Sequence, residues 1–429
     1  MGGSPYEALD DLLHKCIHCG MCLPVCPTYN ITYQEQSSPR GRIRLMKSVH
    51  DGSLDLSSEF VHEMYFCLDC QACQTACPAG VEYGKLVEDA RHLIGQHHKE
   101  PFLLHLIKSI VLRILSSKSM TKTAARCVRW YRKSGIFEAV ERSAILSLVS
   151  DRLHAKHAML PAISGEFFDE STPEVLLPAG KPRGRVAFLS GCVMNVVFSE
   201  IHRHAVGVLL ANNFEVIIPK QQVCCGSLHN HNGEQEAAKD LARQNIDAFD
   251  SLQVDALVVD SAGCSAFLKE YGHLFADDVV YAAKAKRISE SVKDITEFLS
   301  ETGFTIPTAP LNKRITYHEA CHLVHTQKIS RQPRKLLQSI PGVEFLELPE
   351  ATWCCGSAGI YNVTNFDDSM GMLERKMNNL ISTNADIVVT ANPGCHLQLQ
   401  YGIKRRGLNA VVMHPVSLLF QAYRESNMV

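Results

Sequence analysis

Two short stretches, "QVCCGSLHN" at residues 222–230 and "TWCCGSAGIY" at residues 352–361, each place two adjacent cysteines before a glycine. Each pair belongs to a longer pattern, in which one cysteine precedes the pair and another follows it. The first copy contains Cys192, Cys224, Cys225 and Cys264, and the second contains Cys321, Cys354, Cys355 and Cys395. Corresponding cysteines lie 129, 130, 130 and 131 positions apart. This agreement indicates an internal duplication.

Apolar stretches typical of β-strands lead into these cysteines. In the first copy they are "RVAFLSGC" at 185–192 and "ALVVDSAGC" at 256–264, and in the second "RITYHEAC" at 314–321 and "DIVVTANPGC" at 386–395. Helical stretches separate the strands, and this alternation predicts a parallel sheet covered by helices. Ligands of such sheets bind beyond the carboxyl ends of the strands. We therefore expect residues 185–310 and 311–429 to form two tandem α/β repeats, with all eight cysteines on loops and the four thiols of each copy converging.

An adjacent cysteine pair can present two thiolates to one multinuclear centre, and a following glycine permits a close backbone turn. The pattern favours an iron–sulfur centre in each copy. Redox-active thiols, a zinc site and an empty cysteine cluster remain alternatives. Nearby histidines could bind metal or transfer protons, but we expect them to be surface or capping residues: His229, His231, His318, His322 and His325.

The first hundred residues contain a second cysteine pattern, also present twice. "CIHCGMCLPVCP" at 16–27 and "CLDCQACQTACP" at 67–78 share the spacing C-x2-C-x2-C-x3-C-P. In this arrangement three close thiolates bind one [4Fe-4S] cluster and the fourth binds the other cluster. Structural zinc would need only C-x2-C pairs and is disfavoured. The predicted ligands are Cys16, Cys19, Cys22 and Cys77 for cluster one, and Cys26, Cys67, Cys70 and Cys73 for cluster two.

Residues 1–98 are therefore expected to form a mostly helical domain of ferredoxin type with two [4Fe-4S] clusters. Between the two cysteine runs, "RIRLMKSV" at 42–49 predicts a helix, and we expect its basic side chains, Arg42 among them, to be solvated. The predicted fold class is thus multidomain α+β, with this domain followed by the two α/β repeats.

Residues 99–184 are expected to be a helical, basic connector that ends in a linker. Positions 99–133 hold nine Lys and Arg against a single acid, Glu100. The stretch "PFLLHLIKSIVLRILSSK" at 101–118 is apolar with cations at intervals. Such a helix either packs against protein, the reading we favour, or lies on an anionic membrane surface. Residues 161–184 are rich in proline and glycine and read as a linker, and the isolated Cys127 is expected to be buried.

Composition excludes several classes of protein. The 429 residues carry a net charge of −2, which gives no sign of nucleic-acid binding. No apolar run reaches the roughly 18 residues of a membrane-spanning helix. The N-terminal stretch contains acids and no apolar core, so no secretory signal is expected. Seventeen cysteines without such a signal indicate metal ligands in a reducing compartment, and a cytoplasmic protein is expected.

The two ferredoxin-type runs followed by two Cys-Cys-Gly repeats resemble the iron–sulfur subunit of bacterial glycolate oxidase. The similarity is closest in "PRGRIRLMK" at 39–47, "AGCSAFLKEYG" at 262–272 and "TANPGC" at 390–395. This resemblance implies the electron-transfer subunit of a glycolate and D-lactate dehydrogenase complex. FAD-bearing partner subunits would oxidise the substrate. This chain would pass electrons to a respiratory-chain acceptor, a quinone or a cytochrome, with peripheral association at the inner membrane.

One departure separates the chain from the wider superfamily, which includes a heterodisulfide reductase subunit whose repeats end in Cys-x-x-Cys. Here Phe267 and Gln398 occupy the place of the last cysteine, which argues against heterodisulfide chemistry. The sequence contains no flavin-binding motif, and iron–sulfur clusters move single electrons, so a flavoprotein must supply them. The alternatives are an iron–sulfur subunit of a glycerol-3-phosphate or lactate dehydrogenase, and a thiol–disulfide enzyme.

Overall fold

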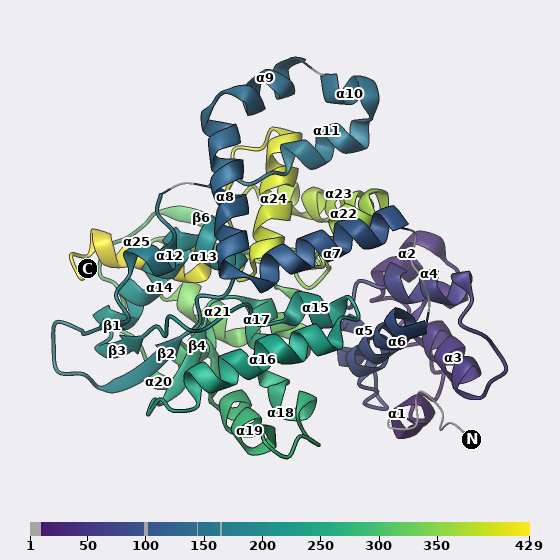
Figure 1. Cartoon of the computed structure of the whole chain (residues 1–429). Helices are drawn as coiled ribbons and strands as arrows, with labels where there is room; N and C mark the ends of the chain where they lie inside the picture. Colours follow the sequence, from purple (N-terminus) through teal and green to yellow (C-terminus); the bar gives the residue numbers. More distant parts are fainter. Residues whose placement is uncertain (1–9, 98–101, 144, 164) are drawn as a thin grey trace.

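The computed structural model describes residues 10–97, 102–143, 145–163 and 165–429. Figure 1 shows a helical N-terminal unit at one side, a helical connector above, and the α/β repeats beside and below them. The predicted fold class is confirmed, because helices dominate the first unit and parallel sheets form both repeats.

Short helices joined by the cysteine-containing loops build the N-terminal unit. Ser38 and Ser57 accept hydrogen bonds from backbone N–H groups at the starts of α3 and α4, which fixes where these helices begin. Met46, Phe60 and Leu86 pack in the core of the unit. The helices are α1 (Asp10–His14), α2 (Pro27–Thr32), α3 (Pro39–His50), α4 (Ser58–Phe66), α5 (Ala72–Thr75) and α6 (Tyr83–His97), with a 3-10 turn, η2 (Glu35–Ser37).

Helix α3 was predicted correctly, but the expectation that its basic residues are solvated is wrong for Arg42. This side chain is fully buried, and its Nη2 lies 3.2 Å from Glu63 Oε2. Its Nη1 donates to Thr28 Oγ1 at 3.0 Å. Helical periodicity explains the difference, because Arg42 and Met46, four residues apart, share the inward face of the helix.

The connector forms five helices: α7 (Phe102–Ser116), α8 (Lys118–Lys133), α9 (Ile136–Ser143), α10 (Ile145–Val149) and α11 (Asp151–Ala158). Helix α7 packs on the rest of the protein, with Leu112 buried and the Lys108 ammonium 4.2 Å from the Tyr65 ring centroid. The other faces of these helices leave large apolar side chains exposed, including Ile110 and Trp130. Cys127 is also exposed, so its predicted burial is wrong.

The stretch read as a linker contains a short helix, α12 (Phe168–Ser171), and a strand, β1 (Val175–Leu176). Strand β1 pairs antiparallel with β3 (Phe214–Ile217). This part of residues 161–184 therefore extends the first sheet.

The two repeats build sheets of the same order. The first sheet runs β1-β3-β2-β4-β5 and the second β7-β6-β8-β9, and every pairing except that of β1 is parallel. The order β3-β2-β4-β5 thus matches β7-β6-β8-β9, as duplication predicts. The further strands are β2 (Gly184–Phe188), β4 (Ala256–Val259), β5 (Val292–Asp294), β6 (Lys313–Tyr317), β7 (Val343–Leu346), β8 (Ile387–Val389) and β9 (Val411–Met413).

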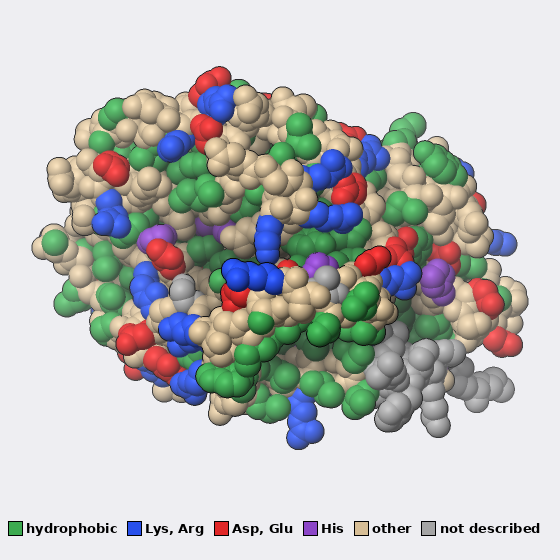
Figure 2. Space-filling model, turned by 90° about the horizontal axis from the view of Figure 1, so that it is seen from above, with side chains coloured by type: hydrophobic (Ala, Val, Ile, Leu, Met, Phe, Trp, Pro, Cys, Tyr) green, Lys and Arg blue, Asp and Glu red, His purple; other side chains and the backbone are tan. Residues whose placement is uncertain are grey.

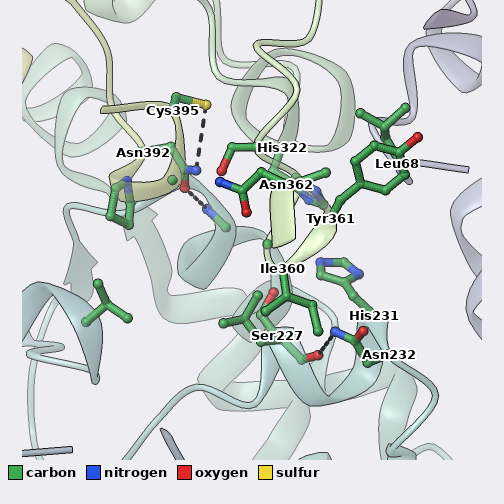
Figure 3. A pocket seen from close by; sticks show the side chains of 18 of the residues that line it. Leu68, Ser227, His231, Asn232, His322, Ile360, Tyr361, Asn362, Asn392 and Cys395 are labelled. Atoms are coloured by element: carbon green, nitrogen blue, oxygen red, sulfur yellow. Dashed lines mark hydrogen bonds between the residues drawn. The ribbon is translucent and has the colours of Figure 1, made fainter. Parts of the chain in front are cut away.

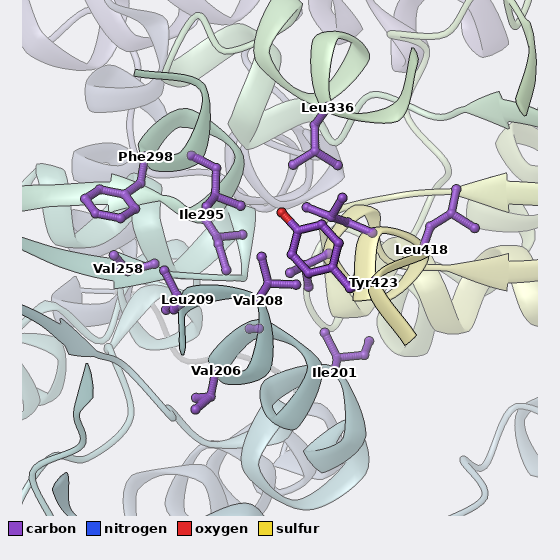
Figure 4. Packing of buried hydrophobic residues seen from close by; sticks show 14 of the residues in the cluster. Ile201, Val206, Val208, Leu209, Val258, Ile295, Phe298, Leu336, Leu418 and Tyr423 are labelled. Carbon is purple, nitrogen blue, oxygen red and sulfur yellow. The ribbon is translucent and has the colours of Figure 1, made fainter. Parts of the chain in front are cut away.

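Helices from both repeats meet in one core. Helices α14 and α20 of the first repeat pack against α21 and α25 of the second, and Leu209, Phe298, Leu336 and Tyr423 belong to the same buried cluster (Figure 4). The two repeats therefore form one continuous body. The bounds in the first repeat are α13 (Val193–Val197), α14 (Ser199–Ala211), α15 (Ser227–His231), α16 (Gln235–Phe249), α17 (Ala262–Lys269), α18 (Tyr271–Leu274), α19 (Ala282–Ser291) and α20 (Ile295–Thr302). Those in the second are η3 (His322–Thr326), α21 (Arg331–Gln338), α22 (Tyr361–Thr364), α23 (Phe366–Thr383), α24 (Pro393–Arg406) and α25 (Pro415–Glu425).

Candidate metal centres

The ligand set predicted for cluster one surrounds a small cavity in the N-terminal unit. Its wall contains Cys16, Cys19, Cys22 and Cys77, and also Cys73 from the other set. Burial raises the pKa of the Cys22 thiol to about 11, so this sulfur would not ionise unaided at neutral pH. A bound metal cation reverses that cost, and the enclosed set of four thiols fits a [4Fe-4S] cluster.

The set predicted for cluster two lies deeper. Cys26, Cys67 and Cys73 are buried and Cys70 is half-buried. The pKa values of Cys70 and Cys73 are raised well above the usual range, first by burial and then by the charges of neighbouring thiols. Ionising these thiols together requires positive charge at their centre, as an iron–sulfur core provides. The backbone N–H of Asp69 donates to Cys67 Sγ at 3.3 Å, a contact typical of cluster loops.

The two cysteine loops share an unusual backbone conformation. His18 and Gly20 have φ values of +54° and +85°, and their counterparts Asp69 and Gln71 have +54° and +57°. Gln71 holds the left-handed conformation without glycine's freedom, which ordinarily costs about 1–2 kcal/mol. A contact from the second repeat offsets this cost, because Thr326 Oγ1 donates to Gln71 Oε1 at 2.9 Å.

In the repeats, the cysteines follow the strands closely. The expectation that all eight lie on loops is wrong for Cys264 and Cys395, which occupy the first turns of α17 and α24. Two or three residues separate these helices from the ends of β4 and β8, so the first helical turn presents the cysteines where a loop was expected. All seventeen cysteines lie in the described part of the chain, and none of them forms a disulfide there.

Each copy gathers its thiols, as the sheet topology predicts. In the first repeat Cys192 Sγ lies 3.4 Å from Cys224 Sγ, and Cys225 Sγ lies 3.3 Å from Cys264 Sγ. In the second repeat the pKa of Cys321 is raised well above its usual range, chiefly by its hydrogen bond with Cys354 and then by burial. His318 adjoins the second site, since a nitrogen of its ring lies within 4.8 Å of the sulfurs of Cys355 and Cys395.

The tertiary structure adds that both sets of thiols line one cavity of about 610 Å³ between the repeats. Figure 3 shows Cys395 at one wall, with Asn392 beside it and Ser227 and Asn232 of the first repeat further across. Asn392 connects the two repeats, because its Oδ1 accepts from the backbone N–H of Gly263 at 3.1 Å while its Nδ2 faces Cys395 Sγ at 3.7 Å. Cys67 of the N-terminal unit also lines this cavity.

The second repeat adjoins cluster two. Cys70 packs against a small apolar cluster that joins Phe66 of the N-terminal unit to Cys354 and Tyr361 of the second repeat. The charge of Cys321 contributes to the raised pKa of Cys70, which again indicates proximity. The cysteine sites thus form a contiguous series from the N-terminal unit into the second repeat.

Most of the histidines are not surface residues, contrary to expectation: His229, His318 and His325 are buried. His231 lies at the cavity wall, where its Nδ1 is 2.6 Å from Glu88 Oε1 and 3.0 Å from Asp69 Oδ2. Burial by itself would lower its pKa, but the hydrogen bonds of the two carboxylates raise the pKa to about 10. The sequence gives no signal for this group, because its members come from three distant segments.

Comparisons with known proteins agree with this geometry. The family described as "Cysteine-rich domain" matches residues 186–269 and 315–400, and the "4Fe-4S dicluster domain" matches residues 12–81. The "Probable glycolate oxidase iron-sulfur subunit" of Bacillus subtilis (strain 168) is 39% identical over 416 residues, 96% of this chain and 94% of that protein. The "Glycolate oxidase iron-sulfur subunit" of Escherichia coli (strain K12) is 30% identical over 395 residues, 91% and 90% of the two chains.

A shorter relative, "Lactate utilization protein A" of Oceanobacillus iheyensis, is 31% identical over 236 residues, 55% of this chain and 96% of its own. The dicluster match confirms the prediction of [4Fe-4S] clusters and with it an electron-transfer role within an oxidoreductase. The chain belongs to the family of glycolate oxidase iron–sulfur subunits.

Proposed function

We propose that this chain relays single electrons from an FAD-bearing subunit that oxidises glycolate, and also D-lactate, to a respiratory-chain acceptor. The observation that carries the proposal is the contiguous series of cysteine sites. Cys73 of the second set lines the cavity of the first set, and Cys70 packs with Cys354 of the second repeat. Such adjacency is what stepwise transfer between neighbouring centres requires.

We further propose the ligand sets and the domain roles. Each [4Fe-4S] cluster, when bound, supplies a one-electron redox step. Cluster one would be held by Cys16, Cys19, Cys22 and Cys77, and cluster two by Cys26, Cys67, Cys70 and Cys73. Residues 1–98 would receive electrons from the flavoprotein, residues 99–184 would connect, and residues 185–310 and 311–429 would form a further redox station.

The exposed surface of the connector supports the proposal that the protein lies peripherally at the cytoplasmic face of the inner membrane. Exposed apolar side chains run along its helices, with Trp130 at 67%, Ile145 at 57% and Leu148 at 85% exposure. Figure 2, which views the molecule from the connector side, shows apolar side chains beside cations on this face. Among the helices that the structure describes, none is long and apolar enough to cross a bilayer. A basic, apolar surface of this kind suits an anionic lipid interface, where a quinone or cytochrome acceptor would be met.

Co-sedimentation with lipid vesicles tests this position. The full chain should pellet with vesicles that contain anionic lipid and remain in solution with neutral ones. Leu148→Ser should weaken the binding, whereas Val279→Ser, at a fully exposed residue outside the connector, should not. Equal binding to both kinds of vesicle would refute the membrane assignment.

Reconstitution tests the electron relay. Purified anaerobically, the chain should show two interacting [4Fe-4S] signals by EPR and no glycolate turnover. Adding the flavoprotein subunits should establish turnover with an artificial acceptor. Cys70→Ser should abolish the signal of one cluster and most of that turnover. Cys127→Ser, at an exposed cysteine outside both sets, should change neither. Turnover by the isolated chain would overturn the proposal.

A thiol–disulfide enzyme is the second candidate, because the thiol pairs of the first repeat lie at 3.3 and 3.4 Å. It predicts disulfide reduction that Cys224→Ala abolishes while the [4Fe-4S] signals remain. A third candidate is the iron–sulfur subunit of a dehydrogenase that acts on glycerol 3-phosphate or L-lactate. Offering these substrates to the reconstituted complex distinguishes it from the leading proposal.

A further inference from the structure

The two repeats share a backbone but differ in the residues behind their thiols. The strand pairings Phe188 with Val258 and Tyr317 with Val389 are equivalent. The next residue along each strand is Leu189 in the first repeat and His318 in the second. Their backbone N–H groups donate to Val258 O at 3.1 Å and to Val389 O at 2.9 Å. Leu189 and His318 therefore occupy the same place, one with a hydrocarbon side chain and the other with an imidazole.

A second difference concerns the helix behind each vicinal pair. Asn245 on α16 donates to Cys224 O at 2.9 Å and accepts from the backbone N–H of Val223 at 2.9 Å. In the second repeat Lys376 on α23 reaches the corresponding loop, where its Nζ donates to Glu350 O at 2.5 Å and to Ala351 O at 3.3 Å. Both side chains are fully buried. A neutral amide in one copy thus corresponds to an ammonium group in the other.

The buried ammonium favours anionic sulfur. Burial lowers the pKa of Lys376 to about 8, while the charges of Cys355, Cys354 and Cys395 oppose that shift. The group remains mainly protonated at neutral pH, and a buried cation needs nearby negative charge. The Glu350 carboxylate and, once ionised on a metal, the sulfurs of the second repeat would supply that charge, whereas the first repeat has no equivalent cation at this place.

His318 has the features of a metal ligand. Its side chain is 1% exposed, and neither ring nitrogen makes a hydrogen bond to the described residues. A nitrogen of the ring and the sulfurs of Cys355 and Cys395 lie within 4.8 Å of one another. Neutral imidazole is the form in which histidine binds metals.

We propose that the second repeat holds a transition-metal centre in which the His318 imidazole is a ligand beside Cys355 and Cys395. Cys321 and Cys354 complete the thiol set on the other side. In the first repeat Leu189 occupies that place and has no ligand atom, so no imidazole enters from the corresponding strand. The role of this centre rests on the proposed electron relay. The assignment of its ligands does not.

The chemistry of these ligands limits the metal. Thiolate and imidazole together suit iron in a sulfur cluster or zinc. Around a tetrahedral metal, neighbouring ligand atoms lie about 3.5–3.8 Å apart, so a contraction of at most about 1 Å would close this site. Gln398, at the place of the fifth cysteine, is occupied elsewhere, since its Nε2 donates to Ser369 Oγ at 3.0 Å. The imidazole thus supplies an additional ligand from the end of β6.

Metal analysis of the full-length chain, purified anaerobically, tests the inference. Wild-type protein should contain metal beyond the iron of the two [4Fe-4S] clusters, either as iron with matching acid-labile sulfide or as zinc. His318→Leu, which copies the first repeat, should lose that metal and keep the [4Fe-4S] signals. His325→Leu, at a buried histidine of the same repeat, is the matched control and should keep all metal. Equal metal in wild type and His318→Leu, or no additional metal in wild type, would overturn the proposal.

A second variant covers the case in which His318→Leu fails to fold, judged by circular dichroism. His318→Cys replaces one ligand by another and should retain the metal. The nitrogen signature should disappear, measured by pulsed EPR for iron or by X-ray absorption for zinc. Retained metal with an unchanged nitrogen signature would overturn the proposal. Glycolate turnover with the flavoprotein, measured in parallel on wild type, separates failure of the proposed function from failure of this site.

Discussion

Gly356, which follows the second vicinal pair, should tolerate alanine less well than other glycines of positive φ. Its φ is +89°, and an added Cβ would lie 2.5 Å from the backbone oxygen of Ser369 on α23. The left-handed conformation costs a non-glycine residue about 1–2 kcal/mol. Forcing a helix away from the loop adds about 1–3 kcal/mol, as in overpacked cores. The expected loss of stability for Gly356→Ala is therefore about 2–5 kcal/mol.

Two other glycines provide matched controls. Gly226, the counterpart in the first repeat, has φ of +92°, and its added Cβ would lie 3.1 Å from Ala238 O. Gly407 ends α24 with φ of +61°, and no heavy atom of the described residues would lie within 4 Å of its added Cβ. Gly407→Ala should lose only the conformational contribution to stability, about 1 kcal/mol. The loss of stability in Gly226→Ala should lie between those of the other two variants. The predicted order of destabilisation is Gly356, then Gly226, then Gly407.

Tryptophan fluorescence during urea unfolding measures this order, because one of the two tryptophans lies close to Gly356 in the sequence. Trp353 is buried three residues before Gly356, whereas Trp130 is exposed and can be replaced by phenylalanine in all variants. The denaturant midpoint of the Trp353 transition is the quantity compared, because a protein of several units need not unfold in two states. If Gly356→Ala and Gly407→Ala shift this midpoint equally, close approach to α23 is not the reason for the glycine.

Two further predictions concern buried charges. Arg42→Met should destabilise the N-terminal unit by about 3–5 kcal/mol, since it leaves Glu63 buried without its partner. The double variant Arg42→Met, Glu63→Leu should recover most of that lost stability. The loss of cluster absorbance during urea titration measures the stability of both variants. Equal destabilisation in the single and the double variant would contradict the reasoning. Burial raises the pKa of Asp294 to about 6, above its value of about 3.9 in an unfolded chain. The folded state then holds this proton more tightly, so stability should fall by up to about 3 kcal/mol as pH rises from about 4 through 6. Asp294→Asn should flatten that slope between about pH 4 and 6, and an unchanged slope would exclude Asp294 as its source.

The short-range patterns of this chain were readable from the sequence. Cysteine spacing within twelve residues sets how a loop can present its sulfurs, so the two ferredoxin-type runs could be recognised from local sequence. The duplication was equally visible, because corresponding cysteines of the two copies lie 129 to 131 positions apart. Strands that end at those cysteines predicted parallel sheets, and the pairings of β2 with β4 and of β6 with β8 confirm them.

What only the tertiary structure decided depends on contacts between distant segments. The core shared by α14, α20, α21 and α25 turns the thiols of both repeats toward one cavity, which no spacing along the chain specifies. The same holds for Arg42, His231 and His318, whose roles follow from burial among partners that are far away in the sequence. From the sequence alone, a charged or titratable side chain is expected to be solvated. Whether it is buried depends on the packing of distant segments, which only the folded chain shows.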